Sequence, residues 1–200
     1  MICEAATNSA VRNIGIDREV SPVDFRGAMR HLAGGVSVIT VGRGKDIAGM
    51  TVTSVSSFSA DPPTLVVSIN RDASSWPLLK RHGFFGVNLL TADQLDVAER
   101  FAGKDGLKGL DRFAGARWTT RVSGVPLLVG ALSAIDCEAE DIIERHSHAL
   151  VIGRVLDIQT SARTAALAYW QGRYVAIDQD EDVARLAEVS LPTAHVARGT

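Results

Sequence analysis

Hydroxyl side chains are concentrated in one stretch of this chain, residues 48–63, with the sequence A-G-M-T-V-T-S-V-S-S-F-S-A-D-P-P. Apolar residues alternate with polar ones up to Val52, which predicts a strand with one dry face. That strand has to end before Pro62 and Pro63, because proline cannot donate to a central ladder. Hydroxyls and free backbone N–H groups at a strand end suit a phosphate or a polar heteroaromatic ring. An ordinary edge strand followed by a serine-rich turn explains the same residues equally well.

Two histidines form a second candidate for chemistry. His146 and His148 flank Ser147, a spacing that places both side chains on one face of a strand. No third ligand of suitable spacing stands out, so we predict no metal site and take strand-end histidines as the simpler interpretation. The sequence also lacks G-x-G-x-x-G after a strand, a Walker A lysine and G-x-S-x-G. These absences argue against a Rossmann site, a P-loop and a hydrolase elbow.

The composition excludes several classes of function. With 200 residues, 46% hydrophobic and 22% charged, the chain suits one globular domain with a substantial core. A net charge of −2 gives no reason to expect nucleic acid or an anionic membrane as a partner. No apolar run is long enough to span a bilayer, and the N-terminus lacks a signal-peptide pattern. We expect a cytoplasmic protein in which Cys137 is a reduced core residue, far in the chain from Cys3.

The first half of the chain carries clear helix and strand signals. Ser21 and Pro22 predict the start of a helix that ends at Gly34-Gly35. The apolar residues of that helix recur at helical spacing and form its expected buried face: Phe25, Ala28, Met29 and Leu32. Strands are predicted at 36–41 and 64–70, with a hairpin turn at 42–46. Ser74 and Ser75 are expected to cap a short helix over 76–79.

The second half continues with strands. A strand at 84–90 is followed by a capping box at 91–94, which predicts a helix. The buried stripe expected on that helix consists of Leu95, Ala98, Phe101 and Ala102. Residues 103–115 indicate a long mobile loop with one helical turn. The remaining predicted strands are 130–140, a fully buried strand at 149–158, 167–169 and 173–177.

These elements favour one architecture. About seven strands, following each other at hairpin spacing, indicate an antiparallel barrel with helices packed outside rather than a doubly wound parallel sheet. We divide the chain into a loose N-terminal arm at 1–20, a domain at 21–178, and a polar tail at 179–200. The tail has at most a weak helix at 183–189.

Several segments together resemble a known family. They are F-R-x-A and G-V-S-V-I-T-V within 25–41, the 48–63 stretch, S-S-W at 74–76, F-G-V-N-L-L at 85–90, R-F-A at 100–102, G-A-L-S-A-I-D-C at 130–137, S-H-A-L-V-I-G-R-V at 147–155, and Y-W-Q-G-R-Y at 169–174. In order and spacing these segments resemble the short-chain flavin reductases of two-component monooxygenase systems. Those reductases belong to the split-barrel FMN-binding superfamily, so the resemblance implies an antiparallel split barrel with flanking helices.

The resemblance also implies which residues contact the cofactors. The flavin would be lined by Val52, Thr53, Ser54, Val55, Ser56 and Ser57. Its phosphate would lie against Ser74 and Ser75 at a helix start, with Arg100 and Phe101 on the nucleotide or phosphate side. His148 matches the histidine of the family's Gly-Asp-His segment near the nicotinamide, but His146 and Ser147 replace the glycine and aspartate. The aromatic residues that would contact NAD(P)H are Tyr169, Trp170 and Tyr174.

The implied reaction is hydride transfer from NADH or NADPH to FMN or FAD, which needs no protein nucleophile. The reduced flavin would reach a separate monooxygenase component by diffusion. The resemblance further implies a homodimer whose flavin site borrows residues from the partner. Three other interpretations stay open: an oxidase resembling pyridoxamine-phosphate oxidases, a non-enzymatic flavin- or haem-binding barrel, and a small-ligand or protein-interaction barrel without a cofactor.

Overall fold

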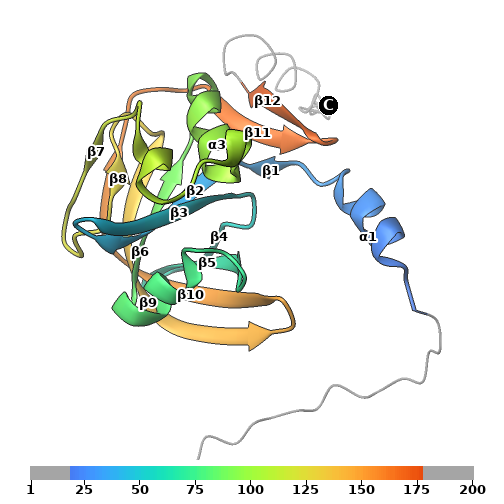
Figure 1. Cartoon of the computed structure of the whole chain (residues 1–200), viewed down its shortest axis with the longest axis horizontal. Helices are drawn as coiled ribbons and strands as arrows, with labels where there is room; N and C mark the ends of the chain where they lie inside the picture. The colour runs from blue at the N-terminus through green and yellow to red at the C-terminus, as the bar shows by residue number, and fades with distance from the viewer. Residues whose placement is uncertain (1–18, 178–200) are drawn as a thin grey trace, which may run out of the picture.

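The computed structural model describes residues 19–177, so the predicted tail helix at 183–189 lies outside the described residues (Figure 1). The helices are α1 (Pro22–Met29), α2 (Trp76–His82) and α3 (Leu95–Ala102), with 3₁₀ turns η1 (Ala92–Gln94), η2 (Lys104–Gly106) and η3 (Gly109–Phe113). The strands are β1 (Gly34–Gly35), β2 (Ser37–Arg43), β3 (Asp46–Val52), β4 (Ser56–Ala60), β5 (Pro63–Asn70), β6 (Phe84–Leu89), β7 (Trp118–Thr119), β8 (Leu127–Leu128), β9 (Ser133–Arg145), β10 (His148–Thr160), β11 (Ala166–Trp170) and β12 (Arg173–Ile177).

One curled antiparallel sheet forms the body of the molecule. Its strand order is β3-β2-β6-β9-β10-β5-β4, and every pair in it is antiparallel. The two edge strands, β3 and β4, are consecutive in the chain and separated only by residues 53–55. Side chains from both halves of the sheet share one buried cluster, including Ile39, Val41, Leu65 and Val67. The predicted split antiparallel barrel is therefore confirmed, with this cluster as its interior.

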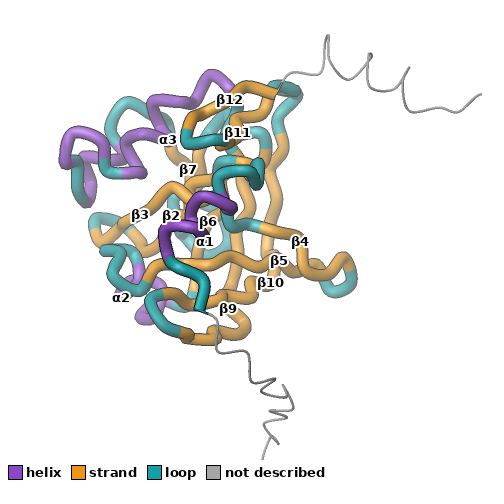
Figure 2. Tube along the Cα trace, turned by 90° about the vertical axis from the view of Figure 1, so that its right-hand side faces the viewer, coloured by secondary structure: helices purple, strands orange, loops and turns teal. Residues whose placement is uncertain are grey.

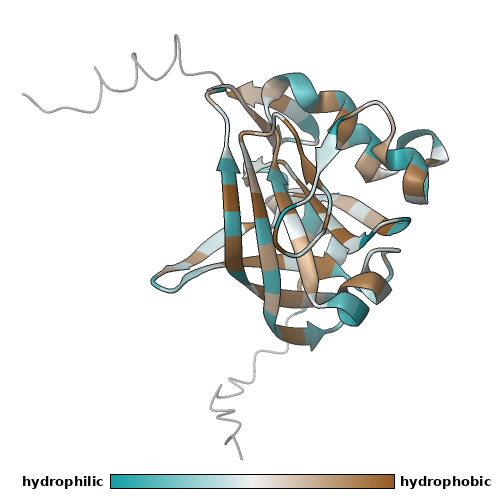
Figure 3. Ribbon diagram, turned by 90° about the vertical axis from the view of Figure 1, so that its left-hand side faces the viewer, coloured by the Kyte–Doolittle hydropathy of each residue, from teal (hydrophilic) through white to brown (hydrophobic). Residues whose placement is uncertain are grey.

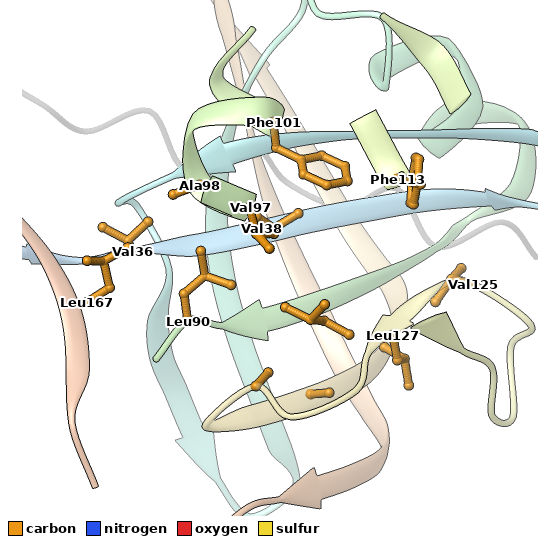
Figure 4. Close-up of a cluster of buried hydrophobic side chains, with 13 residues drawn as sticks. Val36, Val38, Leu90, Val97, Ala98, Phe101, Phe113, Val125, Leu127 and Leu167 are labelled. Carbon is orange, nitrogen blue, oxygen red and sulfur yellow. The ribbon is translucent and has the colours of Figure 1, made fainter. Parts of the chain in front are cut away.

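A second buried cluster packs α3 and the loop after it onto the outside of the sheet (Figure 4). Phe101 meets Phe113 and Trp118 edge to face, at ring-centroid distances of 4.9 and 5.5 Å. The segment 103–115, predicted as a mobile loop with one helical turn, instead forms η2 and η3. Phe113 is buried and anchors this segment. The sequence did not predict this contact, because glycine and charged residues dominate the segment.

The helix α1 differs most from its prediction. Ser21 caps it as expected, since its Oγ accepts from the Asp24 N–H at 3.1 Å. The predicted buried face is wrong in the described chain, because no residue of α1 is buried and Phe25 is 57% exposed. The helix stands off the sheet at one end of the molecule (Figure 1). The predicted end at Gly34-Gly35 is also wrong, because the helix ends at Met29 and the two glycines form β1. Leu32 therefore lies outside the helix.

The other helix signals are confirmed in part. Thr91 and Gln94 form the predicted capping box, in which the Thr91 N–H donates to Gln94 Oε1 at 3.0 Å. Two members of the expected stripe on α3 are exposed, Leu95 and Ala102, and Val97 is buried in their place. The expected serine caps on α2 are not formed: Ser75 has helical backbone angles and its side chain makes no capping bond.

The long strands alternate between buried and exposed positions, which Figure 3 shows as alternating hydrophobic and hydrophilic bands. The expectation of a fully buried strand at 149–158 is wrong: Ala149 and Val151 are buried, whereas Leu150 and Arg154 are exposed. Only one face of β10 lines the barrel interior, so its apolar composition overstated its burial. Cys137 on β9 is free and buried as expected, and burial raises the pKa of its thiol to about 12.

The proline pair ends a strand as predicted: β4 stops at Ala60 and β5 begins at Pro63. The hairpin formed by β4 and β5 projects from the side of the sheet (Figure 2). Within residues 19–177, no helix has the length and apolar character needed to cross a bilayer.

Candidate functional site

A cleft of about 540 Å³ lies where the end of β3 meets β5, the start of β10 and the β11–β12 hairpin. We call this cleft the first lobe. The polar and aromatic side chains in its lining are Thr51, Thr53, Ser54, Ser68, Asn70, His148, Tyr169 and Tyr174. Three segments that are far apart in the sequence therefore converge on the stretch that the sequence singled out for its hydroxyls.

The end of β3 is fixed from two sides. Thr51 Oγ1 donates to the Ala98 carbonyl of α3 at 2.6 Å. Ser54 Oγ donates to the Ser68 carbonyl at 2.9 Å and accepts from the Ser68 N–H at 3.3 Å. The Ser54 side chain thus bonds to β5 at the point where the sheet is split. Thr53 is exposed between these two anchors and faces the cleft.

His148 is the first residue of β10, directly opposite Asn70 of β5 and Arg145 of β9. Its Nδ1 lies 2.8 Å from Ser147 Oγ. His146, two residues earlier, occupies the turn with a φ of +50° and does not line the first lobe. The two histidines are therefore not equivalent, and His148 is the one that joins the cleft.

Aromatic residues from the β11–β12 hairpin close the opposite side of the first lobe. The rings of Tyr169 and Tyr174 meet edge to face, with centroids 5.1 Å apart. Burial raises the pKa of Tyr174, and the neighbouring Tyr169 adds to this shift. The Tyr174 phenol therefore stays neutral near pH 7. Both tyrosine side chains can act as donors or as apolar walls.

A second lobe of about 790 Å³ continues from the first, because Met50, Thr51, Asn70 and Ala102 line both. Ser74 is exposed and lines this second lobe, together with two basic residues from η3 and the residue before it: Lys108 and Arg112. Arg112 Nη1 donates to the Gly49 carbonyl at 3.0 Å, so it also fastens the loop to β3. Sequence reasoning missed both cations, although a basic pair within a glycine-rich segment was a visible signal.

Other predicted site residues have different surroundings. Ser75 is 1% exposed, and its Oγ has no hydrogen-bond partner among the described residues. Phe101 belongs mainly to the buried cluster outside the sheet, with one edge at the second lobe. Arg100 lies beside Gly115 and lines neither lobe. Ser57 lies on β4, exposed and outside both lobes.

The last three predicted residues share another hollow. Val55, Ser56 and Trp170 line a predominantly apolar groove of about 780 Å³ between α1 and the β11–β12 hairpin. We call it the α1 groove. It shares Thr53, Ser54, Tyr169 and Gly172 with the first lobe, so the two hollows are continuous. The structure therefore spreads most of the predicted residues over three connected hollows, whereas Ser57, Ser75 and Arg100 line none of them.

The chemistry available in the lobes is that of binding and orientation. Among residues 19–177, no group of three or more His, Cys, Asp or Glu side chains is arranged to hold a metal ion. The lining offers hydroxyls, one imidazole and phenols. The second lobe adds two cations and two carboxylates, Asp46 and Asp72, of which Asp46 is paired with Arg81. Such a set suits a planar polar ring with an anionic tail.

Known proteins of similar sequence and structure agree with this interpretation. The family model described as "Flavin reductase like domain" matches residues 29–178. A protein named FMN reductase (NADH) RutF from Cronobacter sakazakii is 36% identical over 155 residues, covering 78% of this chain and 92% of that protein.

Two solved structures are similar over most of their length. BorF, the flavin reductase component of a bacterial two-component tryptophan halogenase, has a TM-score of 0.73 and 32% identity, covering 80% of this chain and 99% of that one. The NADH:FAD oxidoreductase SgcE6 of Streptomyces globisporus C-1027, in complex with NAD and FAD fragments, has a TM-score of 0.73 and 28% identity, covering 82% and 99%. With a family model matching residues 29–178, this chain belongs to the flavin reductase like domain family.

Proposed function

We propose that this protein is an NAD(P)H:flavin oxidoreductase that reduces FMN or FAD and supplies the reduced flavin to a separate monooxygenase component. The observation that carries the proposal is the convergence of the β3 end, His148 and the tyrosine pair on one cleft. The relative from Cronobacter sakazakii is named for FMN and NADH, and BorF for a two-component system. NADH is therefore the favoured reductant, with FMN or FAD as acceptor.

The residues present fit a flavin. The first lobe has room for a flat ring between the β3 end and the tyrosines, and the second lobe presents Ser74, Lys108 and Arg112 to an anionic tail. The volume of each lobe lies within the usual range of small-molecule sites, about 300–1,000 Å³. Thr51, Thr53 and Ser54 would hold the ring, and the two cations with Ser74 would hold the phosphate.

A bound flavin supplies the hydride acceptor, so the protein needs no nucleophile or base of its own. What the chain would contribute is position: the β3 end and the tyrosines would orient the two substrates in the first lobe and exclude water. The Thr51 and Ser54 hydroxyls already donate to carbonyls, so the Thr53 hydroxyl is the one in this stretch that would donate to the charge a ring gains on reduction. His148, at the rim of the first lobe, can hydrogen-bond the carboxamide of the nicotinamide or pack on its ring.

We further propose that the enzyme is a homodimer in the cytoplasm. The uncovered apolar face of α1 supports an interface, and the α1 groove leads directly into the first lobe. The buried reduced thiol of Cys137 is in keeping with a cytoplasmic location.

The test is an assay of NADH and NADPH consumption with FMN and FAD, in all four pairs. We expect steady NADH consumption that requires added flavin, and transfer of the reduced flavin to a monooxygenase without a stable complex. Turnover of pyridoxamine phosphate would instead indicate an oxidase. Tight flavin or haem binding without turnover would indicate a binding protein, and no binding at all would rule out a cofactor barrel.

A further inference from the structure

Arg71 makes an unusual set of contacts with the turn that precedes His148. It follows Asn70, the last residue of β5. Its backbone N–H donates to the Ser147 carbonyl at 2.9 Å, and its Nη1 donates to the His146 carbonyl at 2.9 Å. Arg71 therefore bonds to both carbonyls of the turn between β9 and β10.

The β9–β10 ladder closes this turn at the pair Arg145 and His148, but side-chain burial adds nothing to it. Residues 145–148 are all exposed, so no burial of side chains fixes the turn. His146 has a φ of +50°, in the left-handed region that side chains other than glycine seldom occupy. Beyond the β9–β10 ladder, the hydrogen bonds that reach this turn from elsewhere in the described chain come from Arg71.

The Arg71 side chain is itself held in place. Its Nη2 lies 2.7 Å from Glu144 Oε2, and the other carboxylate oxygen of Glu144 lies 2.7 Å from Lys80 Nζ on α2. The guanidinium thus bridges a carboxylate on β9 and a carbonyl in the turn, which matches its planar fork of donors. Lysine at this position would offer a single point charge instead.

The contacts lead from Arg71 to the imidazole. Arg71 bonds to the carbonyls of His146 and Ser147, so it fixes the backbone on both sides of the Ser147 side chain. The Ser147 Oγ in turn is 2.8 Å from Nδ1 of His148. With Nδ1 engaged by the serine hydroxyl, Nε2 is the ring nitrogen left for a ligand in the first lobe. Loosening the turn would let this hydroxyl and the ring rotate away.

We propose that Arg71 is a positioning residue for the pyridine nucleotide: it holds the β9–β10 turn so that Ser147 and His148 present the imidazole to the first lobe. The inference rests on the proposed flavin reductase function, because His148 is taken to contact the nicotinamide. It assigns Arg71 no contact with flavin, so the two substrates are expected to respond differently to its loss.

The experiment replaces Arg71 with methionine, which keeps an unbranched apolar stem and the backbone N–H but removes the guanidinium group. We expect Arg71→Met to raise the KM for NADH by about tenfold, the loss expected for hydrogen bonds from a charged donor. Flavin affinity, followed by FMN fluorescence, and the melting temperature should stay near those of the parent protein. Arg71→Lys should recover little, because one ammonium cannot bridge both acceptors.

Two further variants make the result specific. Lys80→Met removes the other partner of Glu144 but leaves the bonds from Arg71 to the turn, and should keep the parent KM for NADH. In His148→Ala, adding Arg71→Met should raise the KM no further, because the imidazole it positions is gone.

The outcomes separate the inference from the function it rests on. If the parent protein does not oxidise NADH with FMN, the proposed function fails. If the parent is active, an unchanged KM in Arg71→Met overturns the inference. Parallel losses of FMN affinity and thermal stability, or additive effects in the double variant, overturn it as well, since they would show a merely structural role.

Discussion

Ser74 and Ser75 are neighbours in the sequence, but the structure gives them different surroundings. Ser74 is exposed in the second lobe, where Lys108 and Arg112 also lie. Ser75 is buried and its hydroxyl has no partner among the described residues. Of the two hydroxyls, that of Ser74 is therefore the better placed for a flavin phosphate.

Replacing Ser74 with alanine should weaken FMN binding by about 0.5–1.5 kcal/mol, the contribution of one hydrogen bond. Riboflavin, which has no phosphate, should bind as before, and titration of both flavins by fluorescence measures the difference. Ser75→Ala is the matched variant: a comparable, phosphate-dependent loss there would show that its hydroxyl also reaches the phosphate. Equal weakening of FMN and riboflavin in Ser74→Ala would contradict a phosphate role.

At this scale the sequence predicted residue types better than positions. The hydroxyls of 51–54 and the imidazole of His148 were identified and lie together. Lys108 and Arg112 were not identified, because their position depends on how Phe113 packs the 103–115 segment onto α3. Arg100 was carried over from the family motif, but a motif does not determine which way a helical side chain points, and here it lies beside Gly115.

At the scale of elements, the close approach of β3 and α3 holds in place the strand that lines the first lobe. A Cβ on Gly49 would lie 2.7 Å from Ile39 O and 2.7 Å from Phe101 Cε1. The Phe101 ring cannot yield, because Phe113 and Trp118 pack against it. Glycine at this position therefore allows Thr51 to reach the Ala98 carbonyl.

Gly49→Ala should destabilise the fold by about 1–3 kcal/mol, the usual cost of forcing a methyl into a packed core. The displaced strand should also lose flavin affinity, since Thr51 and Thr53 follow directly. Gly35→Ala serves as the control, because a Cβ there meets nothing within 4 Å. Urea unfolding of both variants measures the effect, and equal stability of the two would contradict this account of the packing.

Element prediction failed where burial depends on partners rather than on local pattern. The start of α1 and the capping box at 91–94 were predicted correctly, yet α1 buries no residue, whereas α3 buries Val97, Ala98 and Phe101. The composition of β10 suggested burial on both faces, whereas the sheet places only its Ala149 face inside. Periodicity gives the face of an element, but not what lies against it.

At the scale of the whole molecule, exposed apolar side chains gather next to the site. Phe25 and Met29 on α1 are 57% and 46% exposed, and Leu32 in the turn after the helix is 69% exposed. Trp170, across the α1 groove, is 40% exposed. Such a surface beside a cleft is typical of an interaction site rather than of a free face. A second copy of the chain would cover it and shield the first lobe from water.

We therefore expect a dimer at micromolar concentration in sedimentation experiments. Met29→Asp should shift the protein toward monomer and lower flavin reduction in dilute solution, because a charge cannot be buried unpaired in an apolar interface. Val122→Asp is the matched control: Val122 is 71% exposed but lies outside both lobes and the α1 groove. A parent protein that sediments as a monomer with full activity would contradict the dimer, and so would equal losses in the two variants.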